Sequence, residues 1–535
     1  MRRRDDKGII YSNDEEIEVL RSDGTAERWN KNKILSSLLR ETNISKDAAT
    51  IVTREVEKLI KTMDLRTIPA PLIRELVNAK LIEYGLTEVR RYYTRVGVPV
   101  YDTQNIIINE SSPKKSSEVL ARRIKGEFSL VRLYSSSVVS AYHRKVLHIN
   151  GIDMPDGFFE VSLDLDSLKK NGVRIPDLKI TLKPARRLRT FVNQVLVYSE
   201  VTKYHTVSTI YWNDFNFVLA PYIEKERISE EDLRDLAQSI LFELYTREIP
   251  VTIVLSTEPP TAHAFGPRGE HVGEYRDFTE TARRFAEVML EEYSKGDGLG
   301  GSFEKYVRIV IKGTPQRELL NDYMFFSKDT VLPHKSRYSR GSYAIIEEVS
   351  LNLVRISEEA RNDEEKFLEG VERYKNLALK ALREKSEFLT RVNIKNTIPD
   401  VESWEKYNAL SLYGMRESIM RITGEDPVED KSSFRILKKT LDIVARGRPF
   451  VLNYSCPHRA ALRFSRALQK DSSYEPEIPS LTEGISLSRA MNIFKEVQDY
   501  FDLDVYMDVY LRPSWDVVLK VSHAGIYGIH FIHRR

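Results

Sequence analysis

The sequence predicts two parts of different fold class: a compact α+β module over residues 1–102 and a larger α/β body behind it. Three observations predict this division. A hairpin signal and closely spaced helical patterns fill the first part, a polar stretch follows, and beyond it short β-branched runs alternate with helical segments. Such alternation favours a buried, largely parallel sheet that is covered by helices.

The first module begins with an expected hairpin over residues 16–29, because an Asp-Gly pair within it suits the positive φ angles of a tight turn. Asn30 is placed to cap the helix that follows. The inward face of that helix is expected to carry four apolar side chains: Ile34, Leu35, Leu38 and Leu39. Further helices are expected over 46–64 and 73–84. Strands followed by short helices make a compact α+β unit.

Residues 103–118 are polar around an Ile triplet and contain Ser-Pro-Lys-Lys, a composition typical of a linker. The expected domains are therefore the module over 1–102, a linker over 103–118 and the body over 119–535. Within the body, strands are expected over 251–255 and 307–311, and helices over 229–244, 278–293 and 357–389.

The charge balance bounds the class of protein. The chain has 82 basic and 79 acidic residues, a net charge of +3, which argues against a protein that mainly coats nucleic acid. No apolar run approaches the roughly 20 residues of a membrane span. The charged start of the chain lacks the apolar core of a signal peptide. We therefore expect a cytoplasmic protein without a membrane partner.

Cysteine usage excludes several kinds of site. Cys456 is the one cysteine among 535 residues. It rules out an internal disulfide, a zinc–thiolate cluster and a redox dithiol, and we expect no metal. Scarce Cys and Gln beside 30% charged residues fit a thermophilic protein, in which thermolabile residues are depleted and ion pairs are favoured.

The stretch from Val19 to Ile34, VLRSDGTAERWNKNKI, resembles the signature of the ATP-cone, a small nucleotide-sensing domain. Segments 73–77 and 90–93 also sit where that family has similar residues. The resemblance implies ATP or dATP as the ligand and allosteric regulation as the role. The nucleotide-binding residues that it implies are Val19, Arg21, Glu27, Asn30 and Lys33.

The chemistry of these residues suits a triphosphate, which needs cations and backbone N–H donors. Lys33 would meet phosphates from the start of a helix, and Arg21 would add a second charge from a strand. Two positions depart from the family pattern: Ala70 replaces a frequent threonine and Ser22 replaces a basic residue. The alternative is structural, with Asn30 as a helix cap and Lys33 as a solvated charge.

Later segments resemble, in the same order, parts of the anaerobic (class III, glycyl-radical) ribonucleoside-triphosphate reductases. These segments are Leu147–Asn150, Leu163–Gly172, Trp212–Tyr222, Ser350–Ile356 and Leu410–Ser418. The resemblance implies that the body is a ten-stranded α/β barrel. The first segment departs from the family, because Asn150 and Gly151 stand in place of a His and an Asp.

The chemistry of that family is degenerate in this chain. Radical reduction of a ribose needs a thiyl cysteine, further cysteine to supply reducing equivalents, and a glycyl radical near the C-terminus. Residues 155–160 and 323–328, where the barrel cysteines are expected, contain no thiol, and the chain ends without the glycyl-radical motif. Cys456 lies in a segment that does not carry the thiyl in the family, and it would be catalytic only if the chain were active.

Three other signals are weaker. The Gly cluster at 296–301 follows an expected helix, so it is read as a helix end rather than a dinucleotide loop. His263 and His271 flank a loop but have no third ligand at metal spacing. Four cations form a basic patch that is more often a solvated face than a phosphate site: Lys183, Arg186, Arg187 and Arg189.

The sequence therefore predicts an ATP- or dATP-binding regulatory or scaffold protein that derives from an anaerobic ribonucleotide reductase and lacks reductase activity. A homo-oligomer formed through the ATP-cone and a reductase-related protein partner are the expected partners, and nucleic acid is disfavoured. One alternative is an active reductase that uses a partner subunit. A third possibility is a nucleic-acid- or ribosome-associated factor that uses the basic patch.

Overall fold

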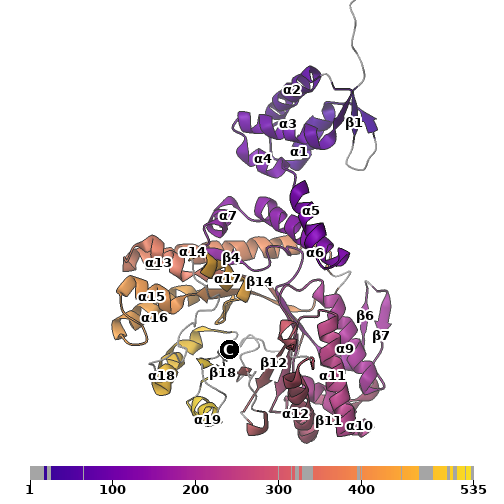
Figure 1. Ribbon diagram of the computed structural model, residues 1–535, viewed down its shortest axis with the longest axis vertical. Helices are drawn as coiled ribbons and strands as arrows, with labels where there is room; N and C mark the ends of the chain where they lie inside the picture. Colours follow the sequence, from indigo (N-terminus) through magenta and orange to yellow (C-terminus); the bar gives the residue numbers. More distant parts are fainter. Residues whose placement is uncertain are drawn as a thin grey trace, which may run out of the picture. The chain divides into compact units, whose positions relative to one another are not determined.

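The structure is a computed structural model. It describes residues 17–20, 26–63, 65–176, 178–298, 301–314, 316–319, 325–327, 341–394, 398, 400–447, 449–468, 486–502, 507–509, 515–524 and 526–531. The chain divides into two compact units, Met1–Arg132 and Leu133–Arg535. Figure 1 shows the elements of both units in the colours of the sequence.

The first unit contains a three-stranded sheet in the order β2-β1-β3. Strands β1 (Glu18–Leu20) and β2 (Ala26–Arg28) are antiparallel, with Val19 opposite Glu27, which confirms the expected hairpin. Its Asp-Gly turn lies outside the described residues. Strand β3 (Thr67–Pro69) runs parallel to β1 on the other side.

Four helices pack with this sheet: α1 (Asn32–Glu41), α2 (Lys46–Thr62), α3 (Ala70–Glu83) and α4 (Thr87–Tyr93). Asn30 Oδ1 accepts a hydrogen bond from Asn32 N at 2.9 Å, so Asn30 serves the start of α1 as expected. Ile34 and Leu38, one turn apart, are buried, whereas Leu39 is 40% exposed. The buried stripe of α1 is thus narrower than the sequence suggested.

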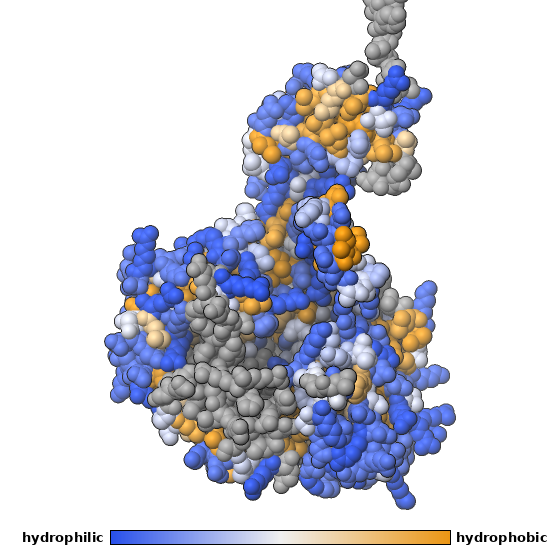
Figure 2. All heavy atoms as spheres, in the orientation of Figure 1, coloured by the Kyte–Doolittle hydropathy of each residue, from blue (hydrophilic) through white to orange (hydrophobic). Residues whose placement is uncertain are grey.

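Two further helices follow within the same unit, α5 (Val100–Asn109) and α6 (Pro113–Phe128). The stretch expected as a linker, 103–118, lies in these helices, and Ser112 caps α6 by accepting from Lys115 N at 3.2 Å. Apolar side chains of α5 face solvent, and Figure 2 shows an apolar patch over this helix. Four of these side chains are largely exposed: Val100 by 85%, Tyr101 by 74%, Ile107 by 60% and Ile108 by 67%.

Among the described residues, the second unit is built on an eleven-stranded sheet. Its strands are β4 (Leu147–Ile149), β5 (Glu160–Leu163), β8 (Ile210–Trp212), β9 (Val251–Ser256), β12 (Val307–Lys312), β13 (Phe325–Ser327), β14 (Tyr343–Asn352), β15 (Glu405–Tyr413), β16 (Val451–Asn453), β17 (Met507–Val509) and β18 (Gly528–Phe531). Strand β4 pairs with β14 off the main path, so ten strands follow one another in the order β16-β15-β14-β5-β8-β9-β12-β13-β18-β17.

The pairing within this sheet is mostly parallel. The run β5-β8-β9-β12-β13 and the run β14-β15-β16 are each parallel, and they meet at the antiparallel pair β14–β5. The sheet curls into a half-barrel with helices around it (Figure 1). This is the α/β reductase-like architecture that the sequence predicts.

Alternate residues of the strands divide between two environments. On β9, Val251, Ile253 and Leu255 belong to the main core, which the sheet shares with the surrounding helices. Val254 instead packs with Tyr211 and Val310 in a separate small cluster. The helices around the sheet include α9 (Leu188–Lys203), α10 (Phe215–Glu226), α11 (Glu230–Thr246), α12 (Thr279–Lys295), α14 (Glu364–Leu389) and α16 (Lys431–Ala445).

The long helix expected over 357–389 is broken. Helix α13 (Leu353–Ala360) ends at Arg361, and α14 begins three residues later. Arg361 and Asn362 have φ angles of 52° and 63°, a left-handed conformation that cannot continue a helix. Asp363 then caps α14 by accepting from Lys366 N at 3.0 Å. The charged stretch that was expected to form one helix therefore contains a turn between two helices.

None of the helices in the described residues is long and apolar enough to cross a membrane.

Candidate nucleotide site and the reductase-like body

A pocket of about 500 Å³ opens in the first unit between the hairpin, α1, the start of α3 and the chain after α4. Four of the five predicted nucleotide-binding residues line it: Val19, Glu27, Asn30 and Lys33. The fifth, Arg21, lies outside the described residues. The described residues that the sequence assigns to the nucleotide therefore lie around one pocket.

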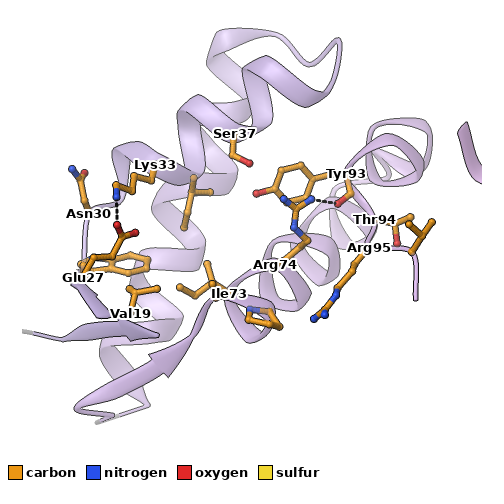
Figure 3. Close-up of a pocket in the computed structure, with 15 residues that line it drawn as sticks. Val19, Glu27, Asn30, Lys33, Ser37, Ile73, Arg74, Tyr93, Thr94 and Arg95 are labelled. Carbon is orange, nitrogen blue, oxygen red and sulfur yellow. Dashed lines mark hydrogen bonds and ion pairs between the residues drawn. The ribbon is translucent and has the colours of Figure 1, made fainter. Parts of the chain in front are cut away.

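One side of the pocket carries an ion pair between Glu27 on β2 and Lys33 on α1 (Figure 3). The side chain of Lys33 is 55% exposed and that of Glu27 is 27% exposed. The Lys33 N–H donates to the carbonyl of Asn30 at 3.0 Å, so the turn before α1 holds the lysine at this edge. Both charges are accessible from the pocket.

The opposite side of the pocket carries Arg74, Tyr93 and Arg95, which the sequence did not assign to the site (Figure 3). Arg74 on α3 donates to Glu41 Oε2 at 2.9 Å and to the Tyr93 carbonyl at 2.8 Å. Its guanidinium also lies 4.4 Å from the centre of the Tyr93 ring, which is a cation–π contact. The segments that hold Arg74 and Tyr93 match the family pattern, but periodicity gives them no role at the pocket.

Electrostatics around Arg74 explain its fixed position. Burial raises the pKa of the Glu41 carboxyl, but hydrogen bonds from Arg74, Ser37 and Arg40 outweigh burial and leave this pKa below its ordinary value. Arg95, in contrast, is exposed and has no bonding partner within the described residues. Arg74 is therefore held by contacts within the unit, whereas Arg95 is available to a ligand.

The lining combines charge with apolar walls. Lys33, Arg74 and Arg95 supply three positive charges against the negative charge of Glu27. The apolar part of the wall consists of Val19, Trp29, Ile34, Ala70, Pro71, Ile73 and Val96. A cavity with several cations at its edges and apolar walls suits a small anion that carries a flat apolar group. Ala70 lies in this wall, where the family often has threonine.

Two family models match the chain. Residues 17–97 match the ATP cone domain, and residues 104–328 match the anaerobic ribonucleoside-triphosphate reductase. The chain therefore joins a region similar to the ATP cone domain to a body that is similar to the anaerobic ribonucleotide reductases. No curated protein matches the chain.

Solved structures show the same fold at low identity. The anaerobic ribonucleotide reductase of Thermotoga maritima with dATP bound in the specificity site has a TM-score of 0.66 and 14% identity, over 80% of this chain and 86% of that chain. The same enzyme with citrate in the active site gives 0.66 and 14%, over 86% and 98%. Hydroxyproline dehydratase from Clostridioides difficile gives 0.53 and 10%, over 94% and 93%.

The segments of the reductase-like body in which barrel cysteines are expected hold other side chains. In 155–160, Phe158 and Phe159 are buried. Glu160 begins β5 and accepts hydrogen bonds from Ser208 Oγ at 3.1 Å and Tyr211 Oη at 3.3 Å. In 323–328, residues 325–327 form β13, and the others lie outside the described residues. Residues 155–160 thus carry buried aromatic side chains and a hydrogen-bonded glutamate, and no thiol.

Cys456 follows the end of β16 and is half-buried. It packs against an apolar cluster formed by Val354, Tyr413, Ala460, Ala461 and Phe464. Its Sγ lies 3.9 Å from the carbonyl oxygen of Pro457. These contacts are those of a small apolar side chain at the edge of a core.

His148 on β4 and Asn150 just after it belong to a network of buried polar side chains. Burial, with the nearby Arg463 and Arg459, lowers the pKa of His148 to about 3, so the imidazole is neutral. Asn150 Nδ2 donates to the Glu348 carbonyl and to Ser350 Oγ, both at 3.0 Å. Any Cβ at Gly151 would come within 2.6 Å of a Glu347 carboxylate oxygen, which accounts for glycine there.

The glycine cluster, the two histidines and the basic patch each lie in an ordinary structural environment. Gly296 ends α12 with a φ of 63°, as a helix terminus requires. His263 and His271 lie on a two-stranded ribbon with their ring nitrogens 3.2 Å apart, and no group of three potential ligands in the described residues could hold a metal ion. The basic patch at 183–189 is exposed before and at the start of α9, and its use stays a prediction.

Proposed function

We propose that this protein is a nucleotide-responsive regulator or scaffold in which the ATP-cone binds ATP or dATP and the reductase-like body carries out no ribonucleotide reduction. The observation that carries the proposal is the pocket of the cone. It gathers Val19, Glu27, Asn30 and Lys33, and it adds the cations Arg74 and Arg95 from distant parts of the same unit.

The phosphates are assigned to the charged edges of the pocket. Lys33 stands at the start of α1, where its ammonium and the helix N-terminus both favour a negative ligand. Binding would exchange the Lys33–Glu27 pair for contacts with phosphate, and Arg95 would add a second charge. The base is assigned to the apolar wall that includes Trp29 and Val19.

The body is assigned a non-catalytic role because its single thiol, Cys456, sits in an apolar cluster after β16. Hydrogen abstraction from ribose and reduction of the product both need sulfur at the substrate. A body without that chemistry can still transmit the state of the cone, since a ligand that favours one arrangement shifts the population toward it. We propose oligomeric state or partner binding as the property that is regulated.

The test of binding is calorimetry and thermal unfolding of the full chain with ATP, dATP and adenosine. We expect ATP and dATP to raise the Tm, because a ligand that binds only the folded state stabilises it. Lys33→Ala should abolish that rise, while Lys58→Ala, which alters an exposed lysine of α2, should preserve it. An equal rise in both variants would place the nucleotide elsewhere.

The proposed lack of reductase activity is tested by an anaerobic assay for deoxynucleotides with ribonucleotide substrates, reductant and candidate activating partners. We expect no product. Turnover that disappears in Cys456→Ser would establish the alternative, an active reductase that uses a partner subunit. Salt-sensitive retention on DNA or RNA that is lost when Arg186 and Arg187 are replaced would instead favour a nucleic-acid-associated factor.

A further inference from the structure

A second cavity, of about 300 Å³, lies in the body, where the end of β5 meets the starts of β14 and β15. Helices α8 (Leu165–Asn171) and α9 contribute the rest of its wall. Two hydrogen bonds hold these ends together: Asp164 N donates to Ser342 Oγ at 3.0 Å, and Glu405 N donates to the Ser342 carbonyl at 3.3 Å. The cavity is therefore part of the folded sheet rather than a gap between surface loops.

The charged lining of this cavity is entirely acidic among the described residues. Asp164, Asp400 and Glu405 line it, and no Lys or Arg does. Lys406, which follows Glu405, points its ammonium at the carbonyls of Val401 and Trp404, at 2.6 and 3.2 Å. Three carboxylates around one hollow create a negative potential that favours a cation.

A buried hydroxyl also faces this hollow. Tyr198 on α9 is 4% exposed, lines the cavity, and its hydroxyl forms no hydrogen bond within the described part of the chain. Burial raises the pKa of this hydroxyl, and the negative charges of Asp400 and Asp164, which line the same cavity, raise it further. The side chain is held in the core while its hydroxyl has no protein partner among the described residues, so a ligand in the cavity could bond to it.

The spacing of the carboxylates distinguishes between kinds of cation. No three of the described His, Cys, Asp and Glu side chains come close enough together to hold a metal ion. The three acidic side chains instead line a volume that accommodates a small organic molecule. The buried ring of Trp404 in the same wall adds a surface that attracts ammonium groups.

We propose that this cavity binds an aliphatic diamine or polyamine. Separate ammonium groups would pair with Asp400 and with Asp164 or Glu405, the methylene chain would lie against Trp404, and one ammonium would donate to the Tyr198 hydroxyl. The site is separate from the pocket of the cone, because all its lining residues belong to the second compact unit.

The test is isothermal calorimetry of the full chain with spermidine, putrescine, butylamine and MgCl₂ at constant ionic strength. We expect saturable one-to-one binding of spermidine or putrescine, with butylamine at least about tenfold weaker because it lacks the second charged contact. Equal binding of butylamine, or Mg²⁺ binding that Asp400→Asn removes, would overturn the proposal.

Two variants locate the site. Tyr198→Phe keeps the ring, and Asp400→Asn keeps the shape at a position with a φ of 53°, which asparagine tolerates well. Each should weaken diamine binding about tenfold. The matched controls Tyr204→Phe and Asp235→Asn change exposed residues of the same unit and should bind normally. Lys33→Ala should also bind normally, and unchanged affinity in both site variants would refute the assignment.

Discussion

At the scale of single residues, the pocket of the cone separates cations that the fold uses from cations that it leaves to a ligand. Arg74 is held by Glu41, by the Tyr93 carbonyl and by the Tyr93 ring. Arg95 lines the same pocket and has no bonding partner within the described residues. Substitution of Arg74 therefore disturbs both folding and binding, whereas substitution of Arg95 isolates the binding contribution.

Arg95→Gln should weaken ATP binding by about tenfold or more, because a charge-assisted contact with phosphate contributes about 1.5–3 kcal/mol. The Tm without ligand should stay unchanged, since the guanidinium contacts no other group among the described residues. Calorimetry with ATP and with adenosine checks this, because adenosine affinity should not fall. Arg90→Gln, an exposed arginine of α4 outside the pocket, is the matched control, and wild-type ATP affinity in Arg95→Gln would contradict the assignment.

His148 should make stability depend on acidity. Its pKa is about 3 in the folded protein, against an ordinary value of 6.5, so the unfolded chain binds a proton that the folded chain excludes. The free energy of unfolding should therefore fall as the pH drops from 6.5 toward 3, by up to about 1.4 kcal/mol per pH unit. Denaturant unfolding across this range measures the slope.

The same measurement on variants tests the origin of that slope. His148→Gln should be less steep over the same pH range, because glutamine takes up no proton. His143→Gln alters an exposed histidine of α7 (Ser136–His143) and should keep the wild-type slope. Identical slopes in all three proteins would show that other groups dominate acid unfolding.

At the scale of elements, α14 is attached to the sheet by a charge pair inside the core. Lys385 on α14 and Glu347 on β14 are both fully buried, with Nζ and Oε2 3.6 Å apart. Burial raises the pKa of Glu347 and lowers that of Lys385. Lys385 also donates to the Met154 carbonyl at 2.7 Å, and Glu347 accepts from Gly151 N at 2.8 Å. The pair thus joins a helix, a strand and the chain after β4.

Lys385→Met should destabilise the body by about 3–5 kcal/mol, because it leaves a buried carboxylate without its counter-charge. The loss should grow as the pH rises above the ordinary Glu pKa of 4.5, since the folded state then favours the protonated acid while the unfolded state ionises. Unfolding by guanidinium at two pH values measures this. Lys380→Met, on the exposed side of α14, should cost far less, and an equal cost would contradict the argument.

At the scale of the whole molecule, the chain consists of two compact units with separate cores. The first unit also presents the exposed apolar side chains of α5, including Val100 and Tyr101. Apolar patches of this kind mark interaction surfaces on soluble proteins. A nucleotide that stabilises one state of the cone is therefore expected to change self-association.

Sedimentation velocity of the full chain should show a different distribution of oligomers with ATP or dATP than without nucleotide. The physical reason is linkage, because a ligand shifts an association equilibrium only by its difference in affinity for the two states. Lys33→Ala should give the nucleotide-free distribution under all conditions. A distribution that ignores nucleotide in the wild-type protein, although calorimetry shows binding, would exclude this mode of regulation.

Local sequence patterns predicted the elements that depend on local physics. The hairpin over 16–29 and the helix that begins after Asn30 followed from turn chemistry and capping, whereas the register with Val19 opposite Glu27 came from the structure. The break after α13 was not predicted, because Arg361 and Asn362 adopt the αL conformation at positions where the sequence has no glycine to indicate it. Arg74 and Arg95 were also missed as lining residues, since α3 and the chain after α4 reach the pocket only through folding.

The sequence by itself determined the resemblance to the ATP-cone, the alternation of strands and helices, and the single cysteine, because each depends on residue identity or on short-range order. Tertiary structure alone decided the second side of the nucleotide pocket, the Lys385–Glu347 pair and the acidic cavity at Tyr198. These sites join side chains from elements far apart in the chain. Periodicity and capping report only on neighbours along the helix or strand, so they cannot show which distant charges meet.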